Sequence, residues 1–166
     1  MYYVGNADLK RTVKEMLDRL LAGESIGPVE FRLIKGELFL GNTWIVGNRH
    51  RIIINHRIGR MIKSKRGLAR AYAVLAHEVG HVMHVNGLAE KPVKEEDFTT
   101  EFRVAAEKGA DRRALRLLAK IYPNPKEIIL EQIAYAHRIS LKYAKEKEAL
   151  ELAEIFAHGR NNGLSN

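Results

Sequence analysis

The sequence predicts an α+β fold in which helical segments precede and follow one small sheet. Apolar residues recur at helical spacing from residue 8 to residue 22. Between residues 29 and 55 they instead form short runs divided by turn-forming pairs, and from residue 67 onward the helical spacing returns. The resulting order of helix, small sheet and three helices is typical of the α+β class.

Length and composition indicate one soluble globular domain. The chain has 166 residues, of which 46% are hydrophobic and 29% charged, enough for one core and too apolar for a disordered protein. We expect the core over about residues 8–121 and a helical extension over about 124–158. The N-terminus lacks the pattern of a signal peptide, and no apolar run approaches the roughly 18 residues that cross a bilayer. We therefore expect a cytoplasmic protein without membrane contact.

The first helix is predicted over residues 8–22, with Gly23 as its C-terminal cap. Residues 29–55 then predict three or four strands in a small, mainly antiparallel sheet. Turn-forming pairs separate their apolar runs. The runs are VEFRLI, ELFL, TWIV and RIIIN, and the pairs are Lys35-Gly36, Gly41-Asn42 and Gly47-Asn48.

Three further helices are predicted after the strands. The first covers about residues 67–87, and the second runs from a cap at Thr99 or Thr100 to about Ile121. An N-cap, a first-turn proline and a capping-box acid at residues 124–127 start the last helix, which reaches as far as Phe156 with a break near Ser140.

The positive charge is concentrated in one stretch. The formal net charge is +8, and residues 1–70 hold 14 basic and 6 acidic side chains, so the whole excess lies there. Residues 49–70 alone contain eight basic side chains and no acidic one. We expect this basic stretch to favour acidic substrates or an acidic partner. Nucleic acid is the less favoured partner, because the stretch has no interleaved aromatic residues.

The sequence His77-Glu78-Val79-Gly80-His81 has the spacing of a catalytic zinc site. In a helix, residues four apart project from one face, so two imidazoles can bind one ion while the intervening Glu78 reaches an activated water. Since the chain has no cysteine, any metal ligands must be His, Asp or Glu. A pair of surface histidines with a solvated glutamate is the alternative, and the apolar residues around the motif argue against it.

A third ligand is expected from the helix that follows. His84 lies one turn beyond His81, and one straight helix does not easily place three imidazoles around one ion. Glu107 is the better candidate, because Gly109 and Ala110 allow close packing against the metal-binding helix. Asp111 can then orient a zinc-bound histidine. The alternative is a solvated acid pair between basic neighbours.

The HEVGH sequence after a predicted hairpin, followed by EKGAD on the next helix, resembles the gluzincin zinc metallopeptidases. The small size resembles most closely the minigluzincins of archaea. This resemblance covers about residues 29–120 and implies a minimal zincin-like core with an active-site helix and a glutamate helix. It implies one Zn²⁺ bound by His77, His81 and Glu107, with Glu78 as general base and acid and Asp111 in support.

The resemblance further implies an endopeptidase with an oxyanion-stabilising Tyr or His and a substrate-binding edge strand. Four residues, Tyr122, Tyr135, His137 and His158, are candidates for the first role, and His137 is preferred. The edge strand is expected at Thr43, Trp44, Ile45 and Val46. The side chain of Trp44 either borders a substrate subsite or belongs to the core.

Two other interpretations stay open. In one, zinc is not catalytic and the protein associates with nucleic acid or a regulatory partner through the basic stretch. In the other, the peptidase is a latent zymogen whose last helix covers the cleft. The apolar surface of that helix also fits a role in the core or in a dimer, and the core is the preferred role.

Overall fold

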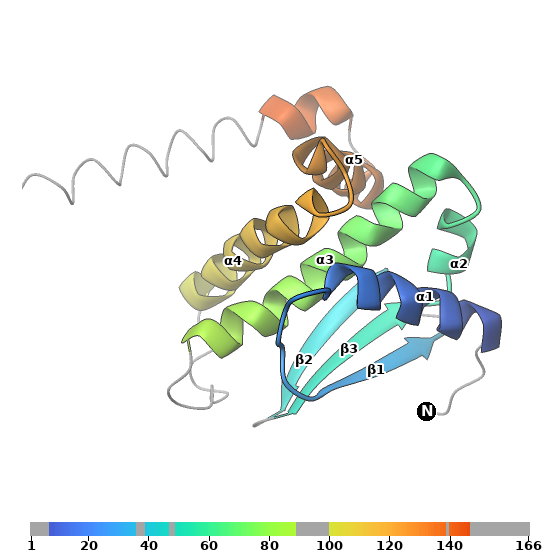
Figure 1. Ribbon diagram of the computed structural model, residues 1–166. Coiled ribbons are helices and arrows are strands. Elements are labelled where there is room, and N and C mark those ends of the chain that lie inside the picture. The colour runs from blue at the N-terminus through green and yellow to red at the C-terminus, as the bar shows by residue number, and fades with distance from the viewer. Residues whose placement is uncertain (1–6, 36–38, 47–48, 89–99, 139, 147–166) are drawn as a thin grey trace, which may run out of the picture. The chain divides into compact units, whose positions relative to one another are not determined.

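Figure 1 shows the computed structural model, which describes residues 7–35, 39–46, 49–88, 100–138 and 140–146. The chain divides into two compact units, Met1–Pro125 and Lys126–Asn166, and each is described by itself. The elements confirm the α+β class. They are α1 (Ala7–Leu20), β1 (Val29–Ile34), β2 (Gly41–Val46), β3 (Arg49–Asn55), α2 (Ile58–Met61), α3 (Lys65–Leu88), α4 (Thr100–Ala119) and α5 (Pro125–His137).

Helix α1 forms where the apolar periodicity predicts it. It buries four side chains of one face, and Gly23 follows in the left-handed region at a φ of 78°. Only glycine adopts this φ without strain, so the predicted C-terminal cap is confirmed. The buried residues are Val13, Met16, Leu17 and Leu20.

The sheet is mixed, so the prediction of a mainly antiparallel sheet is wrong. Its strand order is β1-β3-β2, with β3 parallel to β1 and antiparallel to β2. The most apolar strand, β3, takes the central position, and its Ile52 and Ile54 are buried. Of the predicted ELFL strand, Phe39 and Leu40 lie in a bend before β2, and the other two residues lie outside the described residues.

The two faces of the sheet differ in polarity. Leu33 pairs in register with Ile54, and both side chains are buried on the face that turns toward the helices. Glu30 and Arg51, also paired in register, point to the opposite face and form an ion pair of 2.7 Å. One face of the sheet therefore belongs to the core, and the other carries charged side chains, as expected for a half-buried sheet.

Helices α3 and α4 lie side by side in Figure 1 and are in close backbone contact at Gly80. A Cβ atom at residue 80 would meet the carbonyl group of Ala110, whose carbon lies only 3.0 Å away. Ala110 and Ala114 are fully buried at this contact side of α4. The absent side chain of Gly80 thus sets the distance between the two helices.

Helix α5 ends at His137, and Arg138 adopts a φ of 53°. The hydroxyl oxygen of Ser140 then accepts a hydrogen bond of 3.1 Å from the amide of Tyr143 and caps a helical segment over 141–146. The predicted break near Ser140 is confirmed, and the predicted continuation to Phe156 lies outside the described residues.

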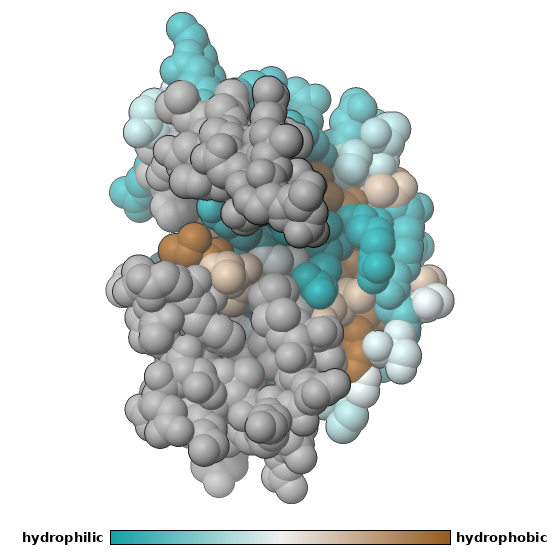
Figure 2. Space-filling model, turned by 90° about the vertical axis from the view of Figure 1, so that its left-hand side faces the viewer, coloured by the Kyte–Doolittle hydropathy of each residue, from teal (hydrophilic) through white to brown (hydrophobic). Residues whose placement is uncertain are grey.

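The described residues give the face drawn in Figure 2 a largely polar surface. On the face drawn in Figure 2, hydrophilic residues predominate among them, and hydrophobic residues show only in small patches. Within the described parts of the chain, no helix combines the length and hydrophobicity needed to cross a membrane.

Replacing Gly80 with Ala should lower the free energy of unfolding by about 1–3 kcal/mol, because the new methyl group meets backbone atoms that cannot move aside. Glycine-to-alanine changes inside helices ordinarily stabilise by about 0.5–1 kcal/mol, so the sign of the effect tests the close approach. Urea unfolding measures it. Arg112→Ala, on the exposed side of α4, should stay within about 0.5 kcal/mol of wild type. A stabilised Gly80→Ala protein would contradict the close approach.

Glu24 connects the end of α1 to the end of α4. Its carboxylate accepts hydrogen bonds from Lys120 at 2.8 Å and from Arg116 at 2.9 Å. The hydrogen bond from Lys120 is the main cause that holds the pKa of Glu24 below its usual value. A depressed pKa of a carboxyl stabilises the fold above its unfolded-state pKa, and this contribution is lost as the pH falls through the folded-state value.

The Glu24→Gln variant should therefore melt below wild type at pH 7, and the difference should disappear in strongly acidic buffer, where both proteins lack the charge. Thermal unfolding followed by circular dichroism, from pH 7 to strongly acidic buffer, measures this difference in melting temperature. Glu15→Gln, at an exposed position of α1, serves as control. A difference in melting temperature that persists at low pH would show that the charge of Glu24 is not the cause.

Candidate metal centre

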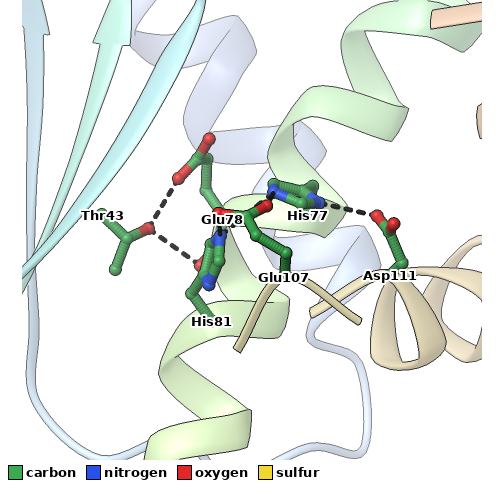
Figure 3. A network of polar contacts seen from close by, with 6 residues as sticks. All are labelled: Thr43, His77, Glu78, His81, Glu107 and Asp111. Atoms are coloured by element: carbon green, nitrogen blue, oxygen red, sulfur yellow. Dashed lines mark hydrogen bonds and ion pairs between the residues drawn. The ribbon is translucent and has the colours of Figure 1, made fainter. Parts of the chain in front are cut away.

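His77, His81 and Glu107 come together between α3 and α4 (Figure 3). The two Nε2 atoms lie 3.0 Å apart. The Glu107 carboxylate places Oε2 at 3.2 Å from Nε2 of His77 and Oε1 at 3.5 Å from Nε2 of His81. Since one ligand atom of each residue lies within 4.8 Å of the others, the group can hold a metal ion.

The positions of these side chains follow from the helices that carry them. Residues 77 and 81 are one turn apart on α3 and project from the same face. Glu107 lies one turn before Asp111 on α4, and the contact between Gly80 and Ala110 brings this turn within reach of both imidazoles. The three side chains are 28%, 16% and 62% exposed, so the group opens to solvent on the side of Glu107.

Asp111 fixes the orientation and tautomer of His77. Its Oδ1 lies 2.8 Å from Nδ1 of His77. A carboxylate only accepts hydrogen bonds, so Nδ1 of His77 carries a hydrogen. The other ring nitrogen, Nε2, faces His81 and Glu107, and in the neutral ring it has the lone pair that a metal ligand requires.

The carboxylates around His77 favour positive charge at this point. Burial favours the neutral ring, but hydrogen bonds with Asp111 and Glu107 and the charges of Glu78 and Asp111 outweigh it and raise the pKa of His77 to about 10. The hydrogen bond with His77 in turn holds the pKa of Glu107 below its usual value. The same negative surroundings attract a proton or a metal cation.

Glu78 lies beside the metal-binding group but is nearly buried, with 6% of its surface exposed. Burial is the main cause that raises its pKa to about 7, against the opposing effects of His77 and of a hydrogen bond from Thr43. The Thr43 hydroxyl lies 2.7 Å from Oε2 of Glu78. Figure 3 shows the carboxylate between α3 and the sheet, on the side of Thr43. Such a carboxyl group can accept and return a proton near neutral pH.

Strand β2 forms an edge of the sheet beside Glu78. The hydrogen bond from the amide of Asn55 to the carbonyl of Leu40 sets the alternation along the antiparallel pair. Main-chain groups of Asn42 and Trp44 consequently face β3, and those of Gly41, Thr43 and Ile45 face the free edge. The predicted edge strand is therefore present: within the described residues no strand pairs with the outer side of β2, the strand that contacts Glu78.

The side chains of this strand point in different directions. Thr43 points to α3, whereas Trp44 points to the opposite face of the sheet and is 53% exposed, so it does not belong to the core. The side chains of Ile45 and Val46 lie outside the described residues.

The oxyanion-stabilising residue stays a prediction. The side chain of His137 and all of His158 lie outside the described residues. Tyr135 belongs to the second compact unit, as does the helix expected to cover the cleft in a zymogen. Tyr122 packs edge-on against Tyr72, with ring centroids 5.7 Å apart. The side chain of His84, the alternative third ligand, is also outside the described residues.

Several cations of the basic stretch lie away from the metal-binding group. Arg51 pairs with Glu30 on the outer face of the sheet. A group of exposed cations instead surrounds α2 and the start of α3, where the first turn has no acidic residue. Lys65 precedes His77 by twelve residues, about 18 Å along the helix. An acidic or nucleic-acid partner stays a prediction for this surface. The exposed cations are Arg57, Arg60, Lys63, Lys65 and Arg66.

Sequence reasoning missed two contributions to the site. The sequence predicts no role for Gly80, although this residue allows the close approach of α4. It predicts that Thr43 contacts the substrate, and the contact of Thr43 with Glu78, 35 residues later, is an additional one. The spacing of Gly41 and Thr43, which places both on one face of a strand, was the available signal.

Replacing Glu107 with Gln should remove most of the metal affinity, because the neutral amide lacks the negative charge of the carboxylate ligand. Asp111→Asn should weaken metal binding about 10–100-fold, since it keeps the three ligands but replaces the carboxylate that orients His77 with an amide. Metal analysis and calorimetric titration measure both effects. Asp18→Asn, at an exposed carboxylate of α1 paired with Lys14, should bind metal as wild type does. Equal metal content in wild type and Glu107→Gln would contradict the ligand assignment.

No protein-family model, no curated protein and no solved structure matches this chain. Its function is therefore inferred from the geometry of the site.

Proposed function

We propose that this protein is a zinc-dependent endopeptidase of the gluzincin type. The observation that carries the proposal is the convergence of His77, His81 and Glu107 beside the buried carboxyl of Glu78. A metal-binding group alone would fit many functions. A carboxyl group with a pKa of about 7, between that group and a free strand edge, favours hydrolysis of a peptide.

Zinc is the metal that this donor set favours. Two imidazole nitrogens and one carboxylate suit zinc, whereas calcium and magnesium prefer oxygen ligands alone. Ligands at about 2.0–2.1 Å from a tetrahedral zinc lie about 3.3 Å from one another. The two Nε2 atoms lie 3.0 Å apart, and they lie 3.2 Å and 3.5 Å from Oε2 and Oε1 of Glu107, respectively, which is close to this value. Three protein ligands also leave a fourth position open, as in catalytic zinc sites.

The protein's own groups supply the proton transfers. A bound zinc ion would contribute a Lewis acid that polarises the substrate carbonyl and lowers the pKa of water to about 7. Glu78 accepts the proton from the attacking water and returns it to the amine that leaves. Its raised pKa suits both steps, because it can hold the proton and release it near neutral pH. Asp111 keeps Nδ1 of His77 protonated throughout, so that Nε2 remains a ligand.

An extended peptide fits the free edge of β2. Main-chain groups of Gly41, Thr43 and Ile45 face that edge and can form the hydrogen bonds of an added strand. Recognition through the main chain explains how a short site can accept peptides of varied sequence. Because Glu78 contacts the same strand through Thr43, a peptide bound there lies next to the proposed general base.

Glu78→Gln should retain zinc and lose about 10²–10⁴-fold in peptide hydrolysis, because the amide cannot accept the proton. Cleavage of a quenched fluorescent peptide library measures activity, and metal analysis measures zinc. Glu15→Gln, at an exposed position of α1, is the matched control and should keep both its zinc and its peptidase activity.

Full activity of Glu78→Gln would contradict the assigned role of Glu78. A wild-type protein that binds stoichiometric zinc but cleaves no member of the library would contradict the enzyme proposal itself.

A further inference from the structure

Two residues of β2 hold the carboxyl group of Glu78. Gly41 and Thr43 are two apart on the strand, so they face the same side of the sheet, toward α3. Both approach the Glu78 side chain, and they do so at different oxygens. This arrangement connects the edge strand to the proposed general base by direct contact (Figure 3).

Thr43 anchors Oε2. Its hydroxyl oxygen lies 2.7 Å from Oε2 and 3.0 Å from the main-chain carbonyl oxygen of Glu78. A hydroxyl has one hydrogen, and the shorter contact, to a group that carries negative charge, is the stronger hydrogen bond. The branched Thr43 side chain has few rotamers in a strand, so it restricts where the carboxylate can lie.

Gly41 leaves room at Oε1. A Cβ atom built on Gly41 would lie 2.6 Å from Oε1, 2.8 Å from Cγ and 3.0 Å from Cδ of Glu78. Real Cβ atoms do not approach so closely, so any larger residue would displace the carboxylate. The φ of Gly41 gives no reason for glycine, since positive φ values among the described glycines occur at Gly23 and Gly27. The space beside Oε1 is therefore what requires glycine here.

We propose that Gly41 and Thr43 are positioning residues that orient the Glu78 carboxylate. Thr43 holds Oε2 with a hydrogen bond, and the absence of a side chain at Gly41 makes room for Oε1, so the two residues together determine where the carboxylate lies. The proposal rests on the endopeptidase function proposed above. It adds that the strand proposed to bind the substrate main chain also orients the Glu78 carboxylate. The same strand therefore positions both the general base and the peptide.

The orientation matters because proton transfer depends steeply on geometry. A misplacement of about 1 Å at a reacting group can lower the rate about 10²-fold. The substrate's main chain is expected at the outward-facing groups of the same strand, and changing the Thr43 side chain does not alter them. Loss of the hydroxyl should therefore lower kcat and leave KM nearly unchanged.

The experiment compares Thr43→Val with Thr43→Ser. Valine keeps the shape and strand preference of threonine but lacks the hydroxyl, whereas serine keeps the hydroxyl. Thr43→Val should lose about 10-fold or more in kcat at an unchanged zinc content, and Thr43→Ser should recover most of it. Thr12→Val is the matched control, because it removes a hydroxyl that donates to a main-chain carbonyl on α1, away from the site.

A second readout does not depend on activity. In protein labelled with ¹³C at the glutamate carboxyl carbons, the Glu78 resonance is the one lost in Glu78→Gln. It should shift in Thr43→Val, return toward wild type in Thr43→Ser and stay unchanged in Thr12→Val.

An unchanged Glu78 resonance in Thr43→Val would overturn the positioning role, whatever the activity. An unchanged kcat, in a wild-type protein that cleaves peptides, would overturn its catalytic importance. If the wild-type protein binds zinc and cleaves nothing, the endopeptidase proposal fails, and the resonance alone still decides whether Thr43 positions Glu78.

Discussion

The close contact between α3 and α4 is the constraint on which the rest of the site depends. His77 and His81 need only one helix to lie on a common face, but a third ligand has to come from another element. The absent side chain of Gly80 lets the backbone of α4 approach at Ala110, with Glu107 about one turn before that point and Asp111 directly after it. A wider separation would leave two histidines without the carboxylate that completes the group.

This contact also concentrates charge. Three carboxylates, from Glu78, Glu107 and Asp111, surround the His77 ring, and they hold its pKa well above the usual value despite burial. Like charges so close together repel unless a cation lies among them. The local electrostatics thus favour a bound cation, and the orientation of Nε2 by Asp111 gives that cation a ready nitrogen ligand. Charge and geometry support the same interpretation of the site.

The sequence was sufficient where the relevant contacts are local. The periodicity of Val13, Met16, Leu17 and Leu20 predicts α1, and the i, i+4 spacing predicts that His77 and His81 share a face.

The sequence was insufficient where the structure depends on contacts between segments far apart in the chain. Parallel and antiparallel strands show similar apolar runs, so the pairing of β1 with β3 could not be predicted. Helix α2 has four residues, too few for a periodic pattern. The contact between Thr43 and Glu78 joins residues 35 apart, and the spacing of Gly41 and Thr43 indicates only that both face one side of a strand, not which residue they contact.

The edge strand explains why these separate features belong to one site. An edge strand exposes main-chain groups that can form hydrogen bonds with a strand of another chain, and proteins usually cover or disrupt such edges. Here β2 has Gly41, Asn42 and Thr43 in its first half, residues with little apolar surface, and it contacts the buried Glu78. A glycine weakens a strand, so its presence at the point of contact with Glu78 indicates a requirement other than sheet stability. That requirement is room for a carboxyl group beside a strand edge where a peptide can bind.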